Sequence, residues 1–236
     1  MMGMRHIVAI GGGGFSSDPE NLALDRYILS LVLRPGPKVC FIPTASADSQ
    51  DYIVRFHNAY KNLGCETSHL SLFWPHRLDF DEFMLEQDVI YVGGGNTRNL
   101  VILWRDWGLD KAIRKAYENG TVLAGVSAGA NCWFDEFSTD SMGPLAPWNG
   151  LGWLKGSFCP HYDTEVDRRP SLKRMLENRE IGPGLASEDR TAVHFVDEGL
   201  HRCITSTPGS KVYAVDLEGE RPLETVDISL DPSASR

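Results

Sequence analysis

The stretch TVLAGVSAGANCW, residues 121–133, decides the fold of this 236-residue chain. Its first half is apolar and predicts a buried strand, and GVSAG at 125–129 fits the G-x-S-x-G pattern. In that pattern a serine lies on a sharp turn between a strand and a helix, and its hydroxyl is exposed. Ser127 is therefore a candidate nucleophile; the alternative is a small residue in a tight turn.

Strand-like and helix-like segments alternate before Ser127. Apolar runs predict strands at 6–10, 38–43, 67–73, 88–95 and 121–127, and helical spacing predicts helices at 20–33, 51–64 and 99–120, the last either one long helix or two abutting ones. Strands joined by such helices predict an α/β fold with a mainly parallel sheet and helices on both faces. After Ser127 we expect a structured loop at 143–156, a charged helix at 168–180, and short antiparallel strands toward the C-terminus at 192–224.

No repeat or low-complexity linker divides residues 1–236, so we expect a single domain. The net charge of −9, with no cluster of lysine or arginine, argues against a nucleic-acid partner. No run of eighteen apolar residues predicts a membrane span, and the first apolar run ends in glycines, which favours a strand over a signal peptide. Five scattered cysteines without a C-x-x-C pair suit a reduced, cytoplasmic protein.

Two glycine runs come directly after predicted strands. GGGG at 11–14 lacks the register of a dinucleotide loop and the G-K-[ST] end of a Walker loop, so we expect close approach of backbone to a small substrate there. VGGGNT at 92–97 precedes a helix, so its amides can face the cleft at the carboxyl ends of the strands. Acyl transfer needs such donors around the oxyanion, and Gly94 or Gly95 together with Ala128 fits that role.

A serine nucleophile also needs a base and an orienting carboxylate. Of seven histidines, His161 is the best candidate because it follows an apolar run and Pro160 and opens a polar segment. Spacing does not choose among the carboxylates, which are Asp135, Glu136, Asp140, Asp163, Glu165, Glu188 and Asp189. The histidines form no close pair of the H-E-x-x-H kind, so we expect neither a metal nor another cofactor.

The motifs YVGGGNT, GVSAGAN and CPHYD, in this order, resemble the peptidase E (aspartyl dipeptidase) family of serine peptidases, which has a class I glutamine amidotransferase-like fold. The resemblance covers most of the chain. It implies Ser127 as nucleophile, His161 as base, and Gly94 or Gly95 with Ala128 around the oxyanion. It places the acid in the loop of Glu188 and Asp189, of which Asp189 ranks first and Glu188 second. Asp140, which follows the turn at Ser127, ranks third.

The resemblance also implies an arginine that binds the aspartate side chain of the substrate. Arg169 is the nearest match, with Arg168 beside it, because a guanidinium binds a carboxylate with two parallel hydrogen bonds. Arg190 departs from the family pattern, since it stands where relatives tend to carry glycine. We expect a serine dipeptidase that takes short peptides with an N-terminal aspartate. The alternatives are a cyanophycinase-like peptidase for β-Asp-Arg and a non-catalytic ligand-binding protein; a homodimer is compatible with each.

Overall fold

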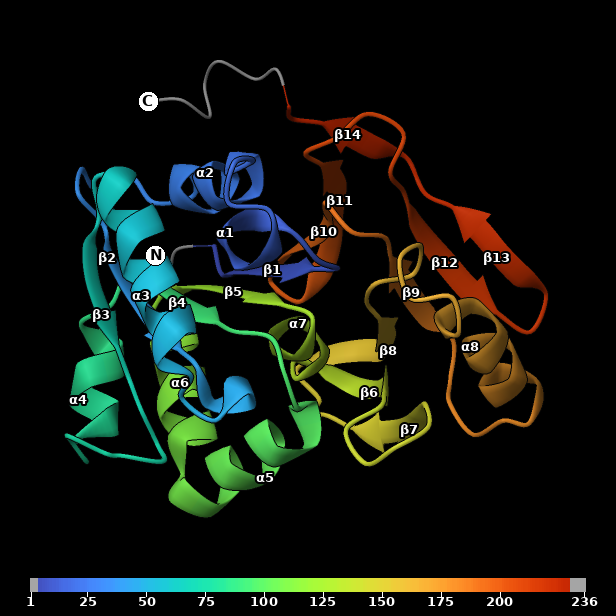
Figure 1. Ribbon diagram of the computed structural model, residues 1–236, viewed down its shortest axis with the longest axis horizontal. Coiled ribbons are helices and arrows are strands. Elements are labelled where there is room, and N and C mark those ends of the chain that lie inside the picture. The colour runs from blue at the N-terminus through green and yellow to red at the C-terminus, as the bar shows by residue number, and fades with distance from the viewer. Residues whose placement is uncertain (1–3, 230–236) are drawn as a thin grey trace.

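The computed structural model describes residues 4–229, and its largest element is an eight-stranded sheet of order β14-β11-β10-β1-β5-β4-β2-β3 (Figure 1). Five adjacent strands of this sheet run parallel to one another: β1 (His6–Ile10), β5 (Val122–Val126), β4 (Val89–Val92), β2 (Lys38–Ile42) and β3 (Glu66–His69). Antiparallel pairing then adds β10 (Thr191–Val196) and β11 (Gly199–Thr205), and β14 (Thr225–Asp227) pairs parallel to β11. The predicted α/β class with a mainly parallel core is confirmed.

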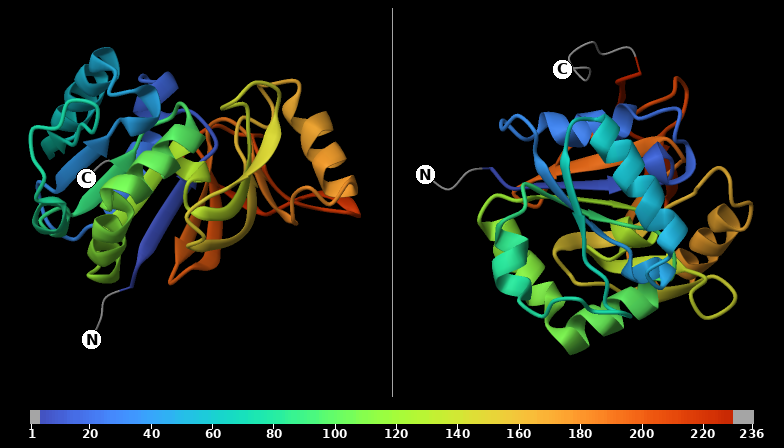
Figure 2. Two further views of the ribbon diagram at one scale, coloured as in Figure 1. Left: turned by 90° about the horizontal axis from the view of Figure 1, so that it is seen from below. Right: turned by 60° about the vertical axis from the view of Figure 1, so that its left-hand side comes forward.

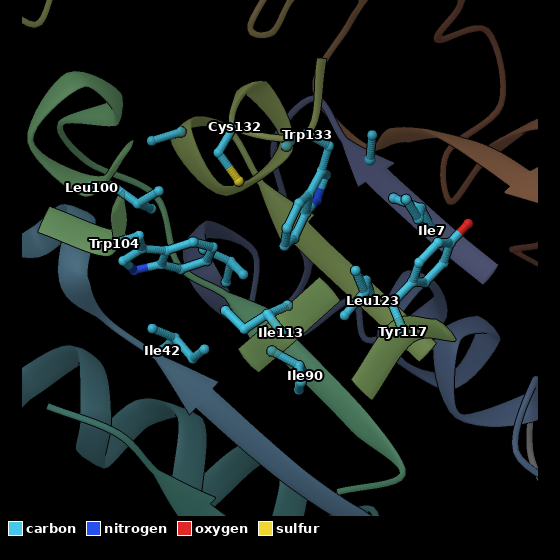
Figure 3. Close-up of a cluster of buried hydrophobic side chains, with 14 of the residues drawn as sticks. Ile7, Ile42, Ile90, Leu100, Trp104, Ile113, Tyr117, Leu123, Cys132 and Trp133 are labelled. Carbon is cyan, nitrogen blue, oxygen red and sulfur yellow. The ribbon is translucent and has the colours of Figure 1, made fainter. Parts of the chain in front are cut away.

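Alternate residues of the parallel strands enter two separate hydrophobic cores, one on each face of the sheet, because successive side chains of a strand point to opposite faces. Ile7 and Ala9 pack with α4 (Phe80–Leu85), α5 (Thr97–Trp107) and α6 (Leu109–Glu118), the core drawn in Figure 3. Val8 and Ile10 pack with α2 (Ala23–Ser30) and α3 (Gln50–Asn62) on the other face. The prediction of helices on both faces is therefore confirmed.

The segment predicted as one long or two abutting helices is two helices. Gly108 separates α5 from α6 with a left-handed backbone, φ 74° and ψ 12°, a conformation in which glycine carries no steric penalty. The glycine is the C-terminal cap of the first helix and the N-terminal cap of the second. None of the helices in residues 4–229 combines the length and apolar character that crossing a membrane requires.

A second, six-stranded sheet of order β13-β12-β9-β8-β6-β7 lies beside the first; its yellow and orange strands are clear in the left view of Figure 2. Its strands are β6 (Phe134–Thr139), β7 (Ala146–Asn149), β8 (Leu154–Cys159), β9 (Gly184–Ser187), β12 (Val212–Asp216) and β13 (Gly219–Pro222). The expectation of a loop over 143–156 is wrong in part, because β7 and the start of β8 lie there. Strand β7 is an edge strand that pairs only with β6 within the described residues, so it tolerates glycine and proline around it.

Candidate active site

Ser127 forms the turn between β5 and the short helix α7 (Ala128–Asn131). Its backbone has φ 54° and ψ −112°, a combination that non-glycine residues rarely adopt and that costs on the order of 1–3 kcal/mol. The turn is fixed from both sides, because the Ser127 N–H donates to the Ile10 carbonyl at 3.0 Å and the Ser127 carbonyl accepts from the Asn131 N–H at 2.9 Å. The serine therefore occupies a strained and firmly held elbow.

The two glycines of the G-x-S-x-G frame are required by close backbone contacts. A Cβ atom on Gly125 would lie 2.1 Å from the carbonyl oxygen of Gly129, and one on Gly129 would lie 2.2 Å from that of Val92. Since real Cβ atoms do not approach backbone oxygens so closely, neither position admits a side chain without movement. Strand and helix can pass each other here only because both residues are glycine.

His161 and Asp189 form a hydrogen-bonded pair. The Nδ1 atom of His161 donates to Oδ1 of Asp189 at 2.7 Å, and the two side chains are 20% and 24% exposed. His161 follows β8 and Pro160 with a left-handed φ of 53°, while Asp189 follows β9. Because Nδ1 carries the shared proton, the neutral ring leaves Nε2 free to act as a base.

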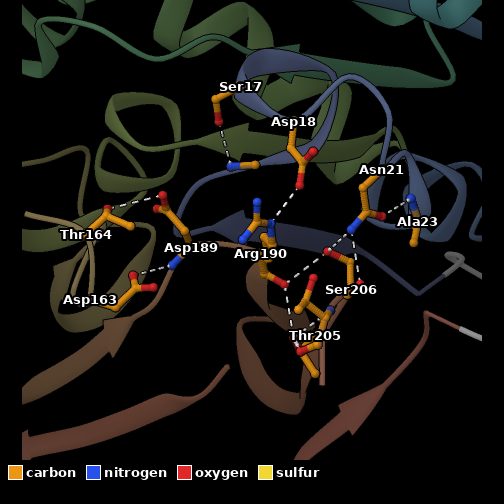
Figure 4. A network of polar contacts seen from close by, with 12 residues as sticks. Ser17, Asp18, Asn21, Ala23, Asp163, Thr164, Asp189, Arg190, Thr205 and Ser206 are labelled. Atoms are coloured by element: carbon orange, nitrogen blue, oxygen red, sulfur yellow. Dashed lines mark hydrogen bonds and ion pairs between the residues drawn. The ribbon is translucent and has the colours of Figure 1, made fainter. Parts of the chain in front are cut away.

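Asp189 is held by neighbours of His161 (Figure 4). The Asp189 N–H donates to Oδ1 of Asp163 at 2.8 Å, and the Thr164 hydroxyl donates to Oδ2 of Asp189 at 3.2 Å. Burial alone would raise the pKa of Asp189, but the hydrogen bond from His161, with Thr164 and the charge of Arg190, holds this pKa below its ordinary value. The carboxylate is therefore ionised where it meets the imidazole.

Strand β1 and the glycine loop that follows it contact both Ser127 and the His161–Asp189 pair. A Cβ atom on Gly12 would lie 2.1 Å from Oδ1 of Asp189 and 2.9 Å from Cε1 of His161, so the pair packs directly on this glycine. Two residues earlier, the Ile10 carbonyl accepts the Ser127 N–H. The sequence assigned the first glycine run to substrate approach, but Gly12 makes room for the base and its acid. Nothing in the spacing pointed to this contact.

The turn after β4 lies beside the serine. A Cβ atom on Gly94 would be 3.4 Å from Cβ of Ser127 and 3.9 Å from its Oγ. The Gly94 N–H, however, donates to the hydroxyl of Tyr52 at 3.3 Å. Within residues 4–229 the N–H groups of Gly95 and Ala128 have no hydrogen-bond partner. Of the two glycines predicted for the oxyanion, Gly95 therefore has the available donor.

The other predicted acids lie away from the imidazole. Glu188 accepts from Arg169 at 3.0 Å, from the Tyr213 hydroxyl at 3.0 Å and from the Lys211 N–H at 2.8 Å. Asp140 is exposed in the turn that follows β6. Of the three ranked carboxylates, the structure brings only Asp189 into contact with His161.

Both predicted arginines are engaged by carboxylates. The guanidinium of Arg169 lies 4.3 Å from the ring centroid of Tyr162 and pairs with Glu188 and Glu220. Arg168 is buried, with Nε 2.7 Å from Glu165 and its other end on a backbone carbonyl. An acidic substrate would therefore reach Arg169 only by displacing one of its present partners.

The thiols next to the site are not nucleophiles. Burial raises the pKa of Cys159 to about 12 and that of Cys132 well above its ordinary value, so both stay protonated. Residues 4–229 contain no cluster of three or more histidine, cysteine, aspartate or glutamate side chains that could hold a metal ion. The reactive groups gathered here are the hydroxyl, the imidazole and the carboxylate.

The family model for peptidase family S51 matches residues 7–203. The chain belongs to this family. It is 54% identical over 212 residues to the uncharacterized peptidase YgaJ of Bacillus subtilis (strain 168), covering 90% of this chain and 92% of that protein. It is 30% identical over 153 residues to peptidase E of Streptomyces coelicolor (strain ATCC BAA-471 / A3(2) / M145), covering 63% of this chain and 59% of that relative. The resemblance to peptidase E is confirmed, and the protein is a peptidase of family S51.

Solved structures share the fold of this S51 peptidase. The crystal structure of a peptidase from an acI-B1 Actinobacterium superposes with a TM-score of 0.75 at 18% identity, covering 95% of this chain and 96% of that one. A putative peptidase E protein from Listeria monocytogenes EGD-e gives a TM-score of 0.64 at 20% identity, covering 84% and 98%. At such identities the likeness concerns the fold, which agrees with the arrangement of sheets and helices described above.

Proposed function

We propose that this peptidase is a serine-type dipeptidase that releases an N-terminal aspartate from dipeptides or short peptides through Ser127, His161 and Asp189. The observation that carries the proposal is the 2.7 Å hydrogen bond between His161 and Asp189, a pair that packs on Gly12, two residues after the Ile10 carbonyl that holds the strained Ser127 turn. Acyl transfer by a serine requires such a turn together with an imidazole that a carboxylate orients. Five unpaired, buried cysteines favour a reducing compartment, so we place the protein in the cytoplasm.

In this mechanism the Ser127 Oγ attacks the scissile carbonyl carbon while Nε2 of His161 takes the hydroxyl proton. Ionised Asp189 keeps the imidazole in the required tautomer and stabilises its cation. The N–H groups of Gly95 and Ala128 donate to the oxygen that becomes negative in the tetrahedral intermediate. His161 then protonates the departing amine, and the same imidazole activates the water that hydrolyses the acyl-enzyme.

The preference for an acidic residue rests on Arg169. Its two carboxylate partners differ in exposure, since the Glu188 side chain is 12% exposed and that of Glu220 is 40% exposed. A substrate carboxylate can take the place of Glu220 while Glu188 continues to orient the guanidinium. The relatives called peptidase E support this choice of substrate, although the match spans only part of their length.

One observation favours a second substrate class, a β-linked aspartyl–arginine peptide. A cavity of about 500 Å³ lies between α8 (Arg168–Glu177) and the β12–β13 hairpin, beside Tyr162 and Arg169. Its walls carry four carboxylates and two cationic side chains: Glu177, Asp216, Glu218, Glu220, Arg169 and Lys173. An arginine side chain of a substrate would find charge partners there.

The test is a panel of Asp-X, neutral and β-Asp-Arg peptides, hydrolysed by the wild type and by Ser127→Ala and His161→Ala. Each variant should lose at least about three orders of magnitude in turnover, because a triad acts as a unit. His76→Ala, which changes an exposed histidine of a surface loop, is the matched control and should hydrolyse peptides like the wild type. Retention of more than about a tenth of the turnover by either triad variant would refute the assignment, and so would a loss in chelator that zinc restores.

A further inference from the structure

The turn from β4 to α5 contains three successive peptide groups, and hydrogen bonds fix the outer two. The Gly94 N–H donates to the Tyr52 hydroxyl at 3.3 Å, and the Asn96 N–H donates to the Ala45 carbonyl at 2.7 Å. Between them lies the Gly95 N–H, which has no partner within residues 4–229. The direction of this free N–H is therefore set by the peptide groups on either side of it.

Glycine makes the turn dependent on such anchors. Gly95 has φ 136°, a backbone conformation that other residues seldom adopt, and a Cβ atom there would lie 2.2 Å from the Ala45 carbonyl oxygen. Because a glycine backbone has more accessible conformations than any other, an unanchored pair of glycines would not hold one N–H direction. The anchor on the α5 side is backbone to backbone. The anchor on the β4 side is a side chain, Tyr52.

Tyr52 is well placed to serve as that anchor. The residue is 5% exposed, and its ring packs edge-on against Phe41 at 4.9 Å and obliquely against Phe15 at 5.7 Å between ring centroids. The hydroxyl also forms a 2.5 Å hydrogen bond with Ser16, in the short helix α1 (Gly14–Ser17). Ser16 belongs to the same post-β1 segment as Gly12, on which His161 and Asp189 pack. One hydroxyl thus connects the Gly94 turn to the loop that supports the imidazole.

We propose that Tyr52 is a positioning residue for the reaction at Ser127: its hydroxyl fixes the Gly94 peptide so that the adjacent Gly95 N–H points at the developing oxyanion. This inference rests on the proposed serine mechanism. The Tyr52 hydroxyl bonds to the Gly94 N–H and to Ser16, and not to Ser127, His161 or Asp189, so it acts through the peptide group that it holds. Its loss should therefore slow acylation of the serine and leave the binding of substrate nearly unchanged.

The experiment compares Tyr52→Phe with the wild type in two assays. One follows covalent labelling of Ser127 by a fluorophosphonate, whose phosphoryl oxygen takes the oxyanion position, and the other separates kcat from KM on the best peptide of the panel. Loss of one hydrogen bond predicts labelling and kcat lower by about 3- to 10-fold, with KM changed by less than about 2-fold. A variant that is merely less stable would instead lose active protein without changing the labelling rate of the folded fraction.

Tyr91→Phe is the matched control, because Tyr91 belongs to the same aromatic cluster and its buried hydroxyl has no hydrogen-bond partner within the described residues. It should label at the wild-type rate. Ser16→Ala keeps Tyr52 in place, removes the other partner of its hydroxyl, and should slow labelling in the same direction by a smaller factor. Wild-type rates in both Tyr52→Phe and Ser16→Ala, or an equal loss in Tyr91→Phe, would overturn the role of Tyr52. Failure of the wild type to label at Ser127 would instead overturn the proposed mechanism.

Discussion

Asp25 should make the stability of this protein fall as the pH rises from about 4 to about 7. Its side chain has no exposed surface; Oδ2 accepts from the Phe15 N–H and Oδ1 from the Tyr60 hydroxyl, both at 3.0 Å. Burial raises the pKa of Asp25 from 3.8 to about 7, although those hydrogen bonds and Arg26 oppose the shift. The carboxyl is therefore protonated in the folded protein over a range in which the unfolded chain is ionised.

The sign and size of the effect follow from proton linkage. Because the folded pKa lies above the unfolded one, the contribution to stability is complete below about pH 4 and is lost as the pH rises to about 7. From about pH 5 to about pH 7 the carboxyl is protonated in the folded protein and ionised in the unfolded chain. Each of these roughly two pH units lowers the free energy of unfolding by about 1.4 kcal/mol. The free energy of unfolding should thus fall by about 2 to 3 kcal/mol between about pH 5 and pH 8 through Asp25 alone.

Asp25→Asn isolates this contribution. The amide oxygen can accept from the Phe15 N–H and the amide nitrogen can donate to the Tyr60 oxygen, so the neutral contacts survive. Urea unfolding of both proteins at about pH 5 and pH 8 should show that the stability of the variant relative to the wild type rises by about 2 to 3 kcal/mol between the two conditions. Asp51→Asn, an exposed position in the first turn of α3, is the control and should keep the wild-type dependence. Equal offsets at both pH values for Asp25→Asn would show that the buried carboxyl is already ionised at about pH 5, and would refute the reasoning.

Two further predictions concern the site. Asp189→Asn should lower kcat/KM by about three to four orders of magnitude with the fold intact, because the imidazole loses its orientation and its charge partner. Asp140→Asn should leave kcat/KM nearly unchanged. The reverse result would show that Asp140, in the turn after β6, is the acid that orients the imidazole. Arg169→Met should lower kcat/KM for Asp-X peptides by about one to two decades and barely affect neutral ones, with lysine restoring only part of the loss. An equal loss on both substrates would show that Arg169 serves only its ion pairs with Glu188 and Glu220.

The parts of the fold that the sequence predicted well are those in which local pattern and burial agree. The run HIVAI became β1 within its predicted bounds, because four of its five residues are buried between two layers of helices. Strand β6 was missed because FDEFST shows no two-residue alternation: its first residue is buried, the next two are partly buried, and the last three are all buried. Only two residues separate it from a one-turn helix. Its signal is weak without the partner strands β7 and β8, which complete it only in three dimensions.

The same distinction applies to the site. Ser127 lies within a short motif whose geometry is local, so its strained turn could be anticipated from the letters alone. The choice of Asp189 over Glu188 could not come from spacing. It depends on which of these two adjacent carboxylates faces His161, and the histidine and the carboxylates follow different, neighbouring strands of the second sheet. Tyr52 carried no sequence signal at all. Its relevance comes from a hydrogen bond to a glycine amide far away in the chain.

Gly12 has a consequence for how relatives of this protein should be compared. The residue offers no functional group, yet any side chain at this position would occupy the space that the His161–Asp189 pair fills. A chain could keep the serine, the histidine and the aspartate and still be unable to join the last two if a larger residue stood here. The lack of a side chain at position 12 is thus as specific a requirement of this chemistry as the imidazole of His161. A search that scores only reactive side chains would count such a chain as active.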